Sequence, residues 1–248
     1  MNGRLMTISP LTLASLQRAL AEGWHIASAT RGVSIAYSLI FTLGGLAIIG
    51  GLLSQGWAPF VLAAAGAFML IGPAILAGFF GIAGAFEAGE AVGLGCIVSG
   101  YKQASRALWA LALICALLFM IFVTDAAILY AYMIGATPVW LDNLLPANAN
   151  VMSFVRWAGV SGLVVAFLLY CVAAFSVPLL CERRAGLVEA VVLSVRVVFG
   201  NFVPCIFWAF FLSTVTIGSI LFLPLLPLTL PWMAYASRAL YLQVLPVA

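Results

Sequence analysis

The chain has 248 residues, of which 66% are hydrophobic and only 7% are charged. A soluble domain carries about 25% charged residues, so most of this surface cannot face water and a soluble globular protein is excluded. Residues 33–86 contain no charged side chain, and this run is long enough for two bilayer crossings of about 20 residues each. The net charge of +3 is small and dispersed, which excludes nucleic acid as a partner. The sequence therefore predicts an integral membrane protein.

Six apolar runs predict an all-α polytopic membrane protein with six transmembrane helices in three hairpins. Backbone groups in lipid have no water to bond, so each run is expected to be a helix. A short cytoplasmic interfacial helix is expected before each hairpin, within residues 1–32, near 87–104 and near 185–199. Residues 33–248 would then form a single transmembrane domain. The spans are predicted at 33–54, 57–84, 107–133, 155–180, 202–221 and 223–243.

Basic residues predict the orientation of the chain in the membrane. Of the ten Lys and Arg residues, only Arg156 flanks the spans on one side, and the other nine lie on the opposite side. An excess of Lys and Arg marks the cytoplasmic side, so both termini are predicted in the cytoplasm. The first 31 residues lack an apolar stretch that ends at a small-residue cleavage site, so no cleavable signal is expected.

The three interfacial segments resemble one another, which predicts three units of surface helix plus transmembrane hairpin. Aligning LQRALAEGWHIAS, GCIVSGYKQAS and VEAVVLSVRVVFG places His25, Lys102 and Arg196 at one position, and Ala19, Cys96 and Ala190 at another. These helices either anchor the hairpins or form a docking surface for a partner or anionic lipid. The docking residues would be Lys102, Arg183, Arg184 and Arg196.

Asp125 is the one acidic residue well inside a predicted span. Carboxylates within the membrane are costly and need a partner, and Arg156 at the outer start of the fourth span is the natural one. The pair is predicted as a structural ion pair near the outer interface, with a site responsive to protons or cations as the alternative.

The positions of prolines and small residues predict where the spans bend and where they pack closely. A proline inside a helix frees a backbone carbonyl and kinks the helix, which either lines a cavity or only bends the span. Small residues at spacings of four, such as Ala77, Gly81 and Ala85, let helices approach closely in lipid. The predicted kinks are at Pro73, Pro178, Pro227 and Pro231.

Residue types that carry catalysis or bind cofactors are sparse. His25 is the single histidine, and the five cysteines form no CxxC pair, so neither a haem, a copper site nor a zinc knuckle is expected. No nucleotide-binding glycine motif occurs. Glu87, Glu90 and Glu182 are expected on the cytoplasmic surface as solvated residues at helix starts. The sequence predicts no enzyme and no cofactor.

The chain resembles a broad group of uncharacterised bacterial inner-membrane proteins, catalogued as a domain of unknown function, some members of which carry a cytochrome c oxidase subunit label. The likeness is best from about 170 to 230. Here the family's acidic pair is replaced by Glu182-Arg183-Arg184, and the sixth span lacks the family's histidines. The similar features are Tyr37 with Gly44-Gly45, Gly72-Pro73 followed by Glu90, FSVPLLCER (175–183), LSVR (193–196) with Asn201 and Trp208, and a proline-rich sixth span.

These observations predict a non-catalytic membrane protein, an accessory or assembly subunit of a larger membrane complex. The resemblance implies that this complex is respiratory. Its partners would be membrane lipids and other membrane subunits. The alternative is a small-solute transporter or channel that uses Asp125 and the proline-kinked helices.

Overall fold

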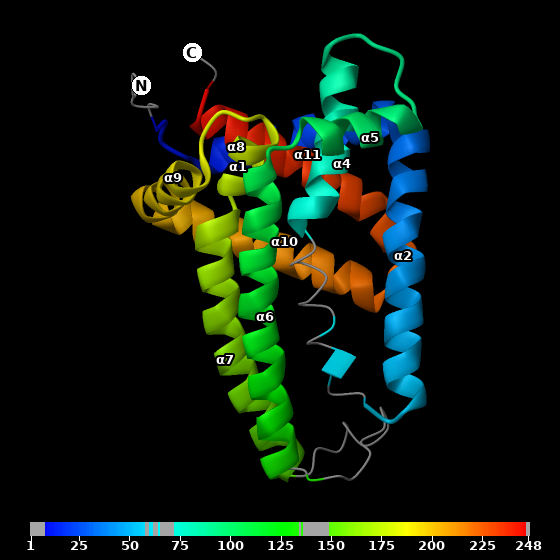
Figure 1. Cartoon of the computed structure of the whole chain (residues 1–248), viewed down its shortest axis with the longest axis vertical. Helices are drawn as coiled ribbons and strands as arrows, with labels where there is room; N and C mark the ends of the chain where they lie inside the picture. The colour runs from blue at the N-terminus through cyan, green and yellow to red at the C-terminus, as the bar shows by residue number, and fades with distance from the viewer. Residues whose placement is uncertain are drawn as a thin grey trace.

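The computed structural model describes residues 8–57, 60–61, 64, 72–133, 135 and 149–246, and its elements are all helices (Figure 1). In chain order they are α1 (Leu13–Ala29), α2 (Arg31–Ser54), α4 (Gly72–Glu87), α5 (Leu94–Gln103), α6 (Arg106–Met133), α7 (Ala149–Ala173), α8 (Ser176–Cys181), α9 (Leu187–Gly200), α10 (Phe202–Leu221), the 3-10 turn η2 (Leu223–Leu225) and α11 (Leu226–Val244).

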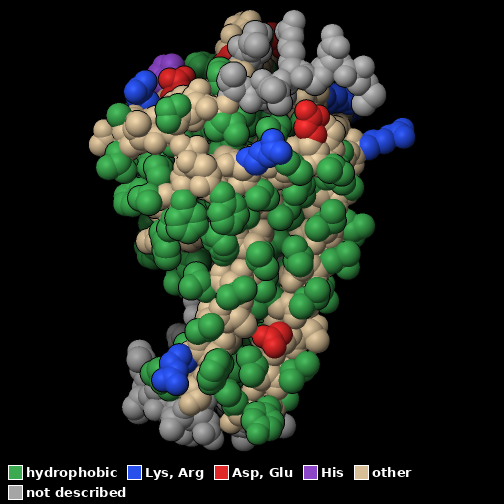
Figure 2. Space-filling model, turned by 90° about the vertical axis from the view of Figure 1, so that its left-hand side faces the viewer, with side chains coloured by type: hydrophobic (Ala, Val, Ile, Leu, Met, Phe, Trp, Pro, Cys, Tyr) green, Lys and Arg blue, Asp and Glu red, His purple; other side chains and the backbone are tan. Residues whose placement is uncertain are grey.

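Four helical segments are long and apolar enough to cross a membrane, and they coincide with four of the predicted spans. They are α2, α6, the combined segment Met152–Cys181, and α10. Only 17–39% of the most apolar part of each is buried inside the protein, so most of their apolar side chains face outward. Figure 2 shows these hydrophobic side chains covering the length of the molecule, while most charged side chains gather at its upper end. This distribution is the one that lipid requires.

The second and sixth predicted spans differ from the other four. The first half of 57–84 lies largely outside the described residues, and its second half is the short apolar helix α4. The sixth run, 223–243, folds into η2 and α11, and α11 is not among the helices apolar enough to cross. Instead, eleven of its 19 residues are buried, and it packs against α1, α2, α4 and α10. The six-span arrangement therefore stays a prediction.

Short helices occur at the three predicted interfacial positions. They are α1, α5 and α9, and each directly precedes a long apolar helix. Thr12 caps α1: its hydroxyl accepts a hydrogen bond from Ser15 N at 3.2 Å, which satisfies a free N–H of the first turn. α1 and α5 lie at the same end of the molecule as the last turns of α11 (Figure 1). We call this end, which also holds Arg238, the charged end.

The last helix of each predicted unit, α4, α8 or α11, packs against a short helix of another unit. The three units are thereby joined in a cycle: the first contacts the second, the second contacts the third, and the third contacts the first. α4 packs on α5, α8 on α9, and α11 returns to α1. In the alignment of the three interfacial segments, Gly23, Gly100 and Ser194 share one position, and all three lie in these contacts. A Cβ on Gly23 would lie 2.5 Å from Ala236 N, and one on Gly100 would lie 2.3 Å from Ala77 O. The first and second crossings are therefore backbone against backbone, as small residues permit.

At the third crossing, Ser194 breaks the neighbouring helix into α7 and α8. Its hydroxyl donates to Cys171 O at 2.8 Å and accepts from Phe175 N at 3.2 Å. It thus replaces the bond that Phe175 N would make to Cys171 O within a continuous helix, and such an insertion kinks a helix. Pro178 adds to the break because it has no N–H for Ala174 O. The break falls at residues 174–175.

Candidate functional site

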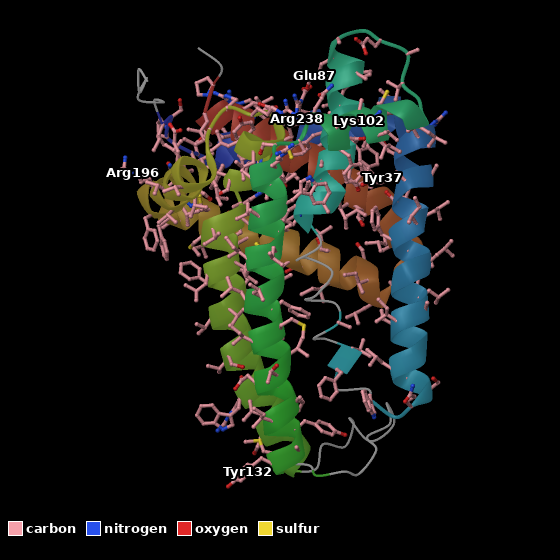
Figure 3. All side chains as sticks on the ribbon, viewed as in Figure 1. Tyr37, Glu87, Lys102, Tyr132, Arg196 and Arg238 are labelled. Carbon is pink, nitrogen blue, oxygen red and sulfur yellow. The ribbon has the colours of Figure 1, made fainter. Side chains whose placement is uncertain are left out.

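The most prominent polar feature of the described residues is a charged network at the charged end, where α4, α8 and α11 meet. Arg238 of α11 stands between two carboxylates: its Nη1 bonds Glu87 Oε1, and its Nη2 lies 3.2 Å from Glu182 Oε1. Its side chain is only 11% exposed, and the guanidinium lies 6.0 Å from the centre of the Phe80 ring. Figure 3 shows Arg238 and Glu87 close together at this end.

Arg184 extends the network to the end of the described chain. Its Nη1 donates to Tyr241 Oη at 2.6 Å and to Leu245 O at 2.8 Å, and its Nη2 donates to Pro246 O at 2.8 Å. The Tyr241 hydroxyl in turn donates to Glu182 Oε2 at 3.1 Å. Burial raises the pKa of Tyr241, the Glu182 carboxylate raises it further, and Arg184 opposes this shift. The hydroxyl therefore stays protonated at neutral pH and can donate.

A small polar cavity of about 100 Å³ adjoins Arg238 and Glu182. Its other lining residues are Ala77, Phe80, Gly81, Gly84, Gly100, Gln103 and Cys181. Two buried atoms of its lining residues have no hydrogen-bond partner: Arg238 Nε, and Glu182 Oε1, which forms only the ion pair with Arg238. At roughly 30 Å³ per water, the cavity holds about three waters or one small polar group.

The charged network holds helix ends together and adjoins one small polar cavity. Its two guanidinium groups balance its two carboxylates, and each charge has an opposite partner within the protein. Among the residues described, no group of three His, Cys, Asp or Glu side chains could hold a metal ion. The arrangement joins three helix ends and leaves one donor and one acceptor without a hydrogen-bond partner in residues that line a small cavity.

Asp125 and Arg156 form no ion pair with each other; the ion pairs of the described part of the chain all involve Arg184 or Arg238. Asp125 lies half-buried in a shallow, mostly apolar depression along α6, on the same face as Ile121 and Ile128. Those two neighbours are 64% and 63% exposed, so this face of α6 points outward. The predicted hairpin implied that the two residues lie at the same depth in the membrane. It did not determine the rotation of α6 about its axis, which decides the direction of Asp125.

The four prolines occupy different settings. Pro178 lies in the first turn of α8, directly after the helix break, and Pro231 is inside α11. Pro227 lies in the first turn of α11, where its missing N–H costs little. Pro73 is the second residue of the described part of α4. None of the four lines the polar cavity.

The predicted docking residues divide into two groups. Lys102, Arg183 and Arg196 are exposed, whereas Arg184 is turned inward by its bonds to Tyr241 and the end of the chain. The expectation that Glu182 is a solvated surface residue is wrong, because its side chain is 22% exposed and paired. Glu87 is 44% exposed, yet it bonds Arg238.

Sequence reasoning missed Arg238 as a site residue, although a signal was present. Arg238 falls inside the predicted sixth span, and an arginine at such a position needs a buried partner. Arg238 was instead assigned to the cytoplasmic side as one of its basic residues, and no partner was sought for it. Its partner Glu87 is 151 positions away in the chain, which no local pattern could indicate.

Comparison with known proteins shows a family match over part of the chain. Residues 60–182 match the family model described as "Predicted integral membrane protein (DUF2189)". No curated protein and no solved structure matches the chain. The matched region includes Gly72-Pro73, Glu90 and nearly all of FSVPLLCER, but it ends before LSVR, so most of the 170–230 stretch that we expected to be most similar lies beyond it. Residues 60–182, which hold Glu87 and Glu182, are therefore similar to this family of predicted integral membrane proteins.

Proposed function

We propose that the protein is a non-catalytic accessory or assembly subunit of a larger complex in the bacterial inner membrane. The observation that carries this proposal is an outward face of α2 made of small residues. Gly44, Ala47 and Gly51 recur at spacings of three and four and are all exposed. A Cβ on either glycine would meet nothing within 4 Å.

A small-residue face lets a second helix approach closely in lipid, where packing drives association. The charged network supports a structural role as well, because its charges pair within the protein. A small-solute transporter draws less support. Asp125 lies on an outward face of α6, and the prolines do not share its depression.

The test of this function is purification of the tagged full-length protein from its native membranes in mild detergent. We expect a second membrane protein to co-purify in stoichiometric amount. Leucines at both Gly44 and Gly51 should abolish this, because they fill the face that the partner helix contacts. Gly159→Leu is the matched control, since Gly159 is an exposed glycine of α7 with open space around it.

A pure homo-oligomer or monomer would contradict the subunit role. Retention of the partner by the Gly44→Leu, Gly51→Leu variant would contradict the assignment to this face of α2.

We further propose that the charged end faces the cytoplasm and that both termini lie there. α1 and the last turns of α11 lie at this end (Figure 1), and most charged side chains gather there (Figure 2). Tyr132, whose side chain is 88% exposed, lies at the opposite end (Figure 3). The Lys and Arg excess supports this orientation.

Cysteine labelling in intact spheroplasts tests this orientation. In a Cys96→Ser background, a membrane-impermeant maleimide should label Tyr132→Cys, and Arg196→Cys should react only after permeabilisation. Cys115, Cys171, Cys181 and Cys205 are buried and should give a low background. The reverse labelling pattern would show that the charged end faces outward.

A further inference from the structure

Three residues with exposed basic side chains, Lys102, Arg106 and Arg183, lie where the α5–α6 junction contacts the end of α8. Arg183 Nη2 donates to Lys102 O at 3.1 Å, and Ser105 N donates to Leu180 O at 3.2 Å. These two bonds bring Arg183 beside Lys102, and Arg106 follows at the start of α6. We call Lys102, Arg106 and Arg183 the basic rim.

The backbone of Arg183 holds an uncommon conformation at this rim. Its φ is 53°, and it is the one non-glycine residue with positive φ among those described. Such a conformation persists where the surrounding structure imposes it, and it recurs at functional sites. Here it turns Arg183 outward while Glu182 and Arg184, on either side, point into the charged network.

The basic rim has no acidic counterpart in the described structure. The nearby carboxylates of Glu182 and Glu87 pair with Arg238, and no ion pair among the described residues includes a rim residue. Three positive charges are therefore left for an anion from outside the chain. Arg106 increases the positive potential at the rim further, because it lies at the start of α6, where the helix dipole is positive.

The polar cavity lies next to the rim. Gln103 and Glu182 line it, and they are the chain neighbours of Lys102 and Arg183. Figure 3 shows Lys102 near Arg238 and Glu87 at the charged end. Two of its lining residues carry buried atoms without a hydrogen-bond partner: Arg238 Nε is a donor, and Glu182 Oε1 is an acceptor. A hydroxyl group supplies both complements, because it accepts one hydrogen bond and donates another.

Aromatic side chains place the rim at the membrane surface. Trp109 follows Arg106 by one helical turn, is 45% exposed, and stacks on Tyr101 with ring centres 6.0 Å apart. Exposed tryptophans at the ends of spans lie at the level of the lipid headgroups. The rim is therefore within reach of headgroups of the leaflet at the charged end.

We propose that the basic rim and the cavity bind the headgroup of an anionic phospholipid that carries free hydroxyls, of the phosphatidylglycerol type. The phosphate lies against Lys102, Arg106 and Arg183. The headgroup hydroxyls enter the cavity, where they donate to Glu182 Oε1 and accept from Arg238 Nε. Basic pockets beside spans on the cytoplasmic side bind anionic headgroups in this way. This proposal does not depend on the subunit role.

Native mass spectrometry of the detergent-purified protein tests the site with three added lipids of identical acyl chains: phosphatidylglycerol, phosphatidic acid and phosphatidylcholine. We expect retention to fall in that order. Lys102→Ala and Arg183→Ala should each weaken phosphatidylglycerol binding about fivefold, the effect of one basic residue near an anionic headgroup. Arg196→Ala, which removes an exposed cation of α9 away from the rim, should leave binding unchanged.

The variant Gly84→Leu tests the contribution of the cavity independently of the contribution of the basic rim. Gly84 lines the cavity, and a Cβ there meets nothing within 4 Å, so a leucine adds apolar volume at the cavity wall without a clash at its Cβ. This variant should bind phosphatidic acid as before and lose the preference for phosphatidylglycerol; size-exclusion chromatography confirms that it remains folded. Equal retention of phosphatidylglycerol and phosphatidylcholine overturns the proposal. So does a loss of binding in Arg196→Ala equal to that in Lys102→Ala.

Discussion

Replacing Arg238 by methionine is expected to destabilise the protein by about 3 kcal/mol, because it removes the ion-pair partner of Glu87 and the closer of the two ion-pair partners of Glu182. Methionine keeps most of the volume and the contact with Phe80, so the change reports mainly on charge. The measurement is the free energy of unfolding of the detergent-solubilised protein in a denaturant titration. Removing one member of a buried pair costs more than the pair itself contributes, because the remaining charge stays desolvated.

A double-mutant cycle identifies the source of this loss. Glu182→Gln removes the stranded charge, so adding it to Arg238→Met should cost less than the sum of the two single changes. Arg196→Ala is the control: this side chain is exposed and forms no ion pair among the described residues, and its removal should change stability by less than about 0.5 kcal/mol. An unfolding free energy of Arg238→Met within that margin of the unmodified protein would show that the network contributes little.

Gly100→Ala is expected to cost at least as much, about 3 kcal/mol, or to prevent folding. The added Cβ would lie 2.3 Å from Ala77 O and 2.9 Å from the Cα of Gly81. Both contacts are with backbone, so no side chain can rotate away and α5 must separate from α4. Overpacking of a tight contact costs typically 1–3 kcal/mol, and the upper end applies where the obstacle is rigid.

Gly95→Ala provides a matched control in the same helix. A Cβ at Gly95 meets nothing within 4 Å, so this change should be neutral or stabilise α5 by about 0.5–1 kcal/mol through the loss of glycine's conformational freedom. Thermal or denaturant unfolding of the two variants side by side measures the difference. Equal stability of Gly100→Ala and Gly95→Ala would contradict the close crossing of α4 and α5.

Run length and composition were sufficient to predict membrane insertion, α2, α6, α10 and the span ending at Cys181. These features depend on the properties of consecutive residues: about 20 apolar side chains must be solvated by lipid wherever they lie. The short helices α1, α5 and α9 were also predictable, because the resemblance of the three segments is visible along the chain. Small-residue spacing pointed to the close approach at Gly81 for the same reason.

Only the tertiary structure decided how these helices rotate and which of them is buried. The run 223–243 was expected to be a span, and its sequence alone did not show that most of α11 is buried against neighbouring helices, among them α1 and α4. Helix rotation turned Asp125 away from Arg156, and folding brought Arg238 to Glu87 across 151 positions. Charges pair by distance in space, and that distance depends on how every intervening helix packs.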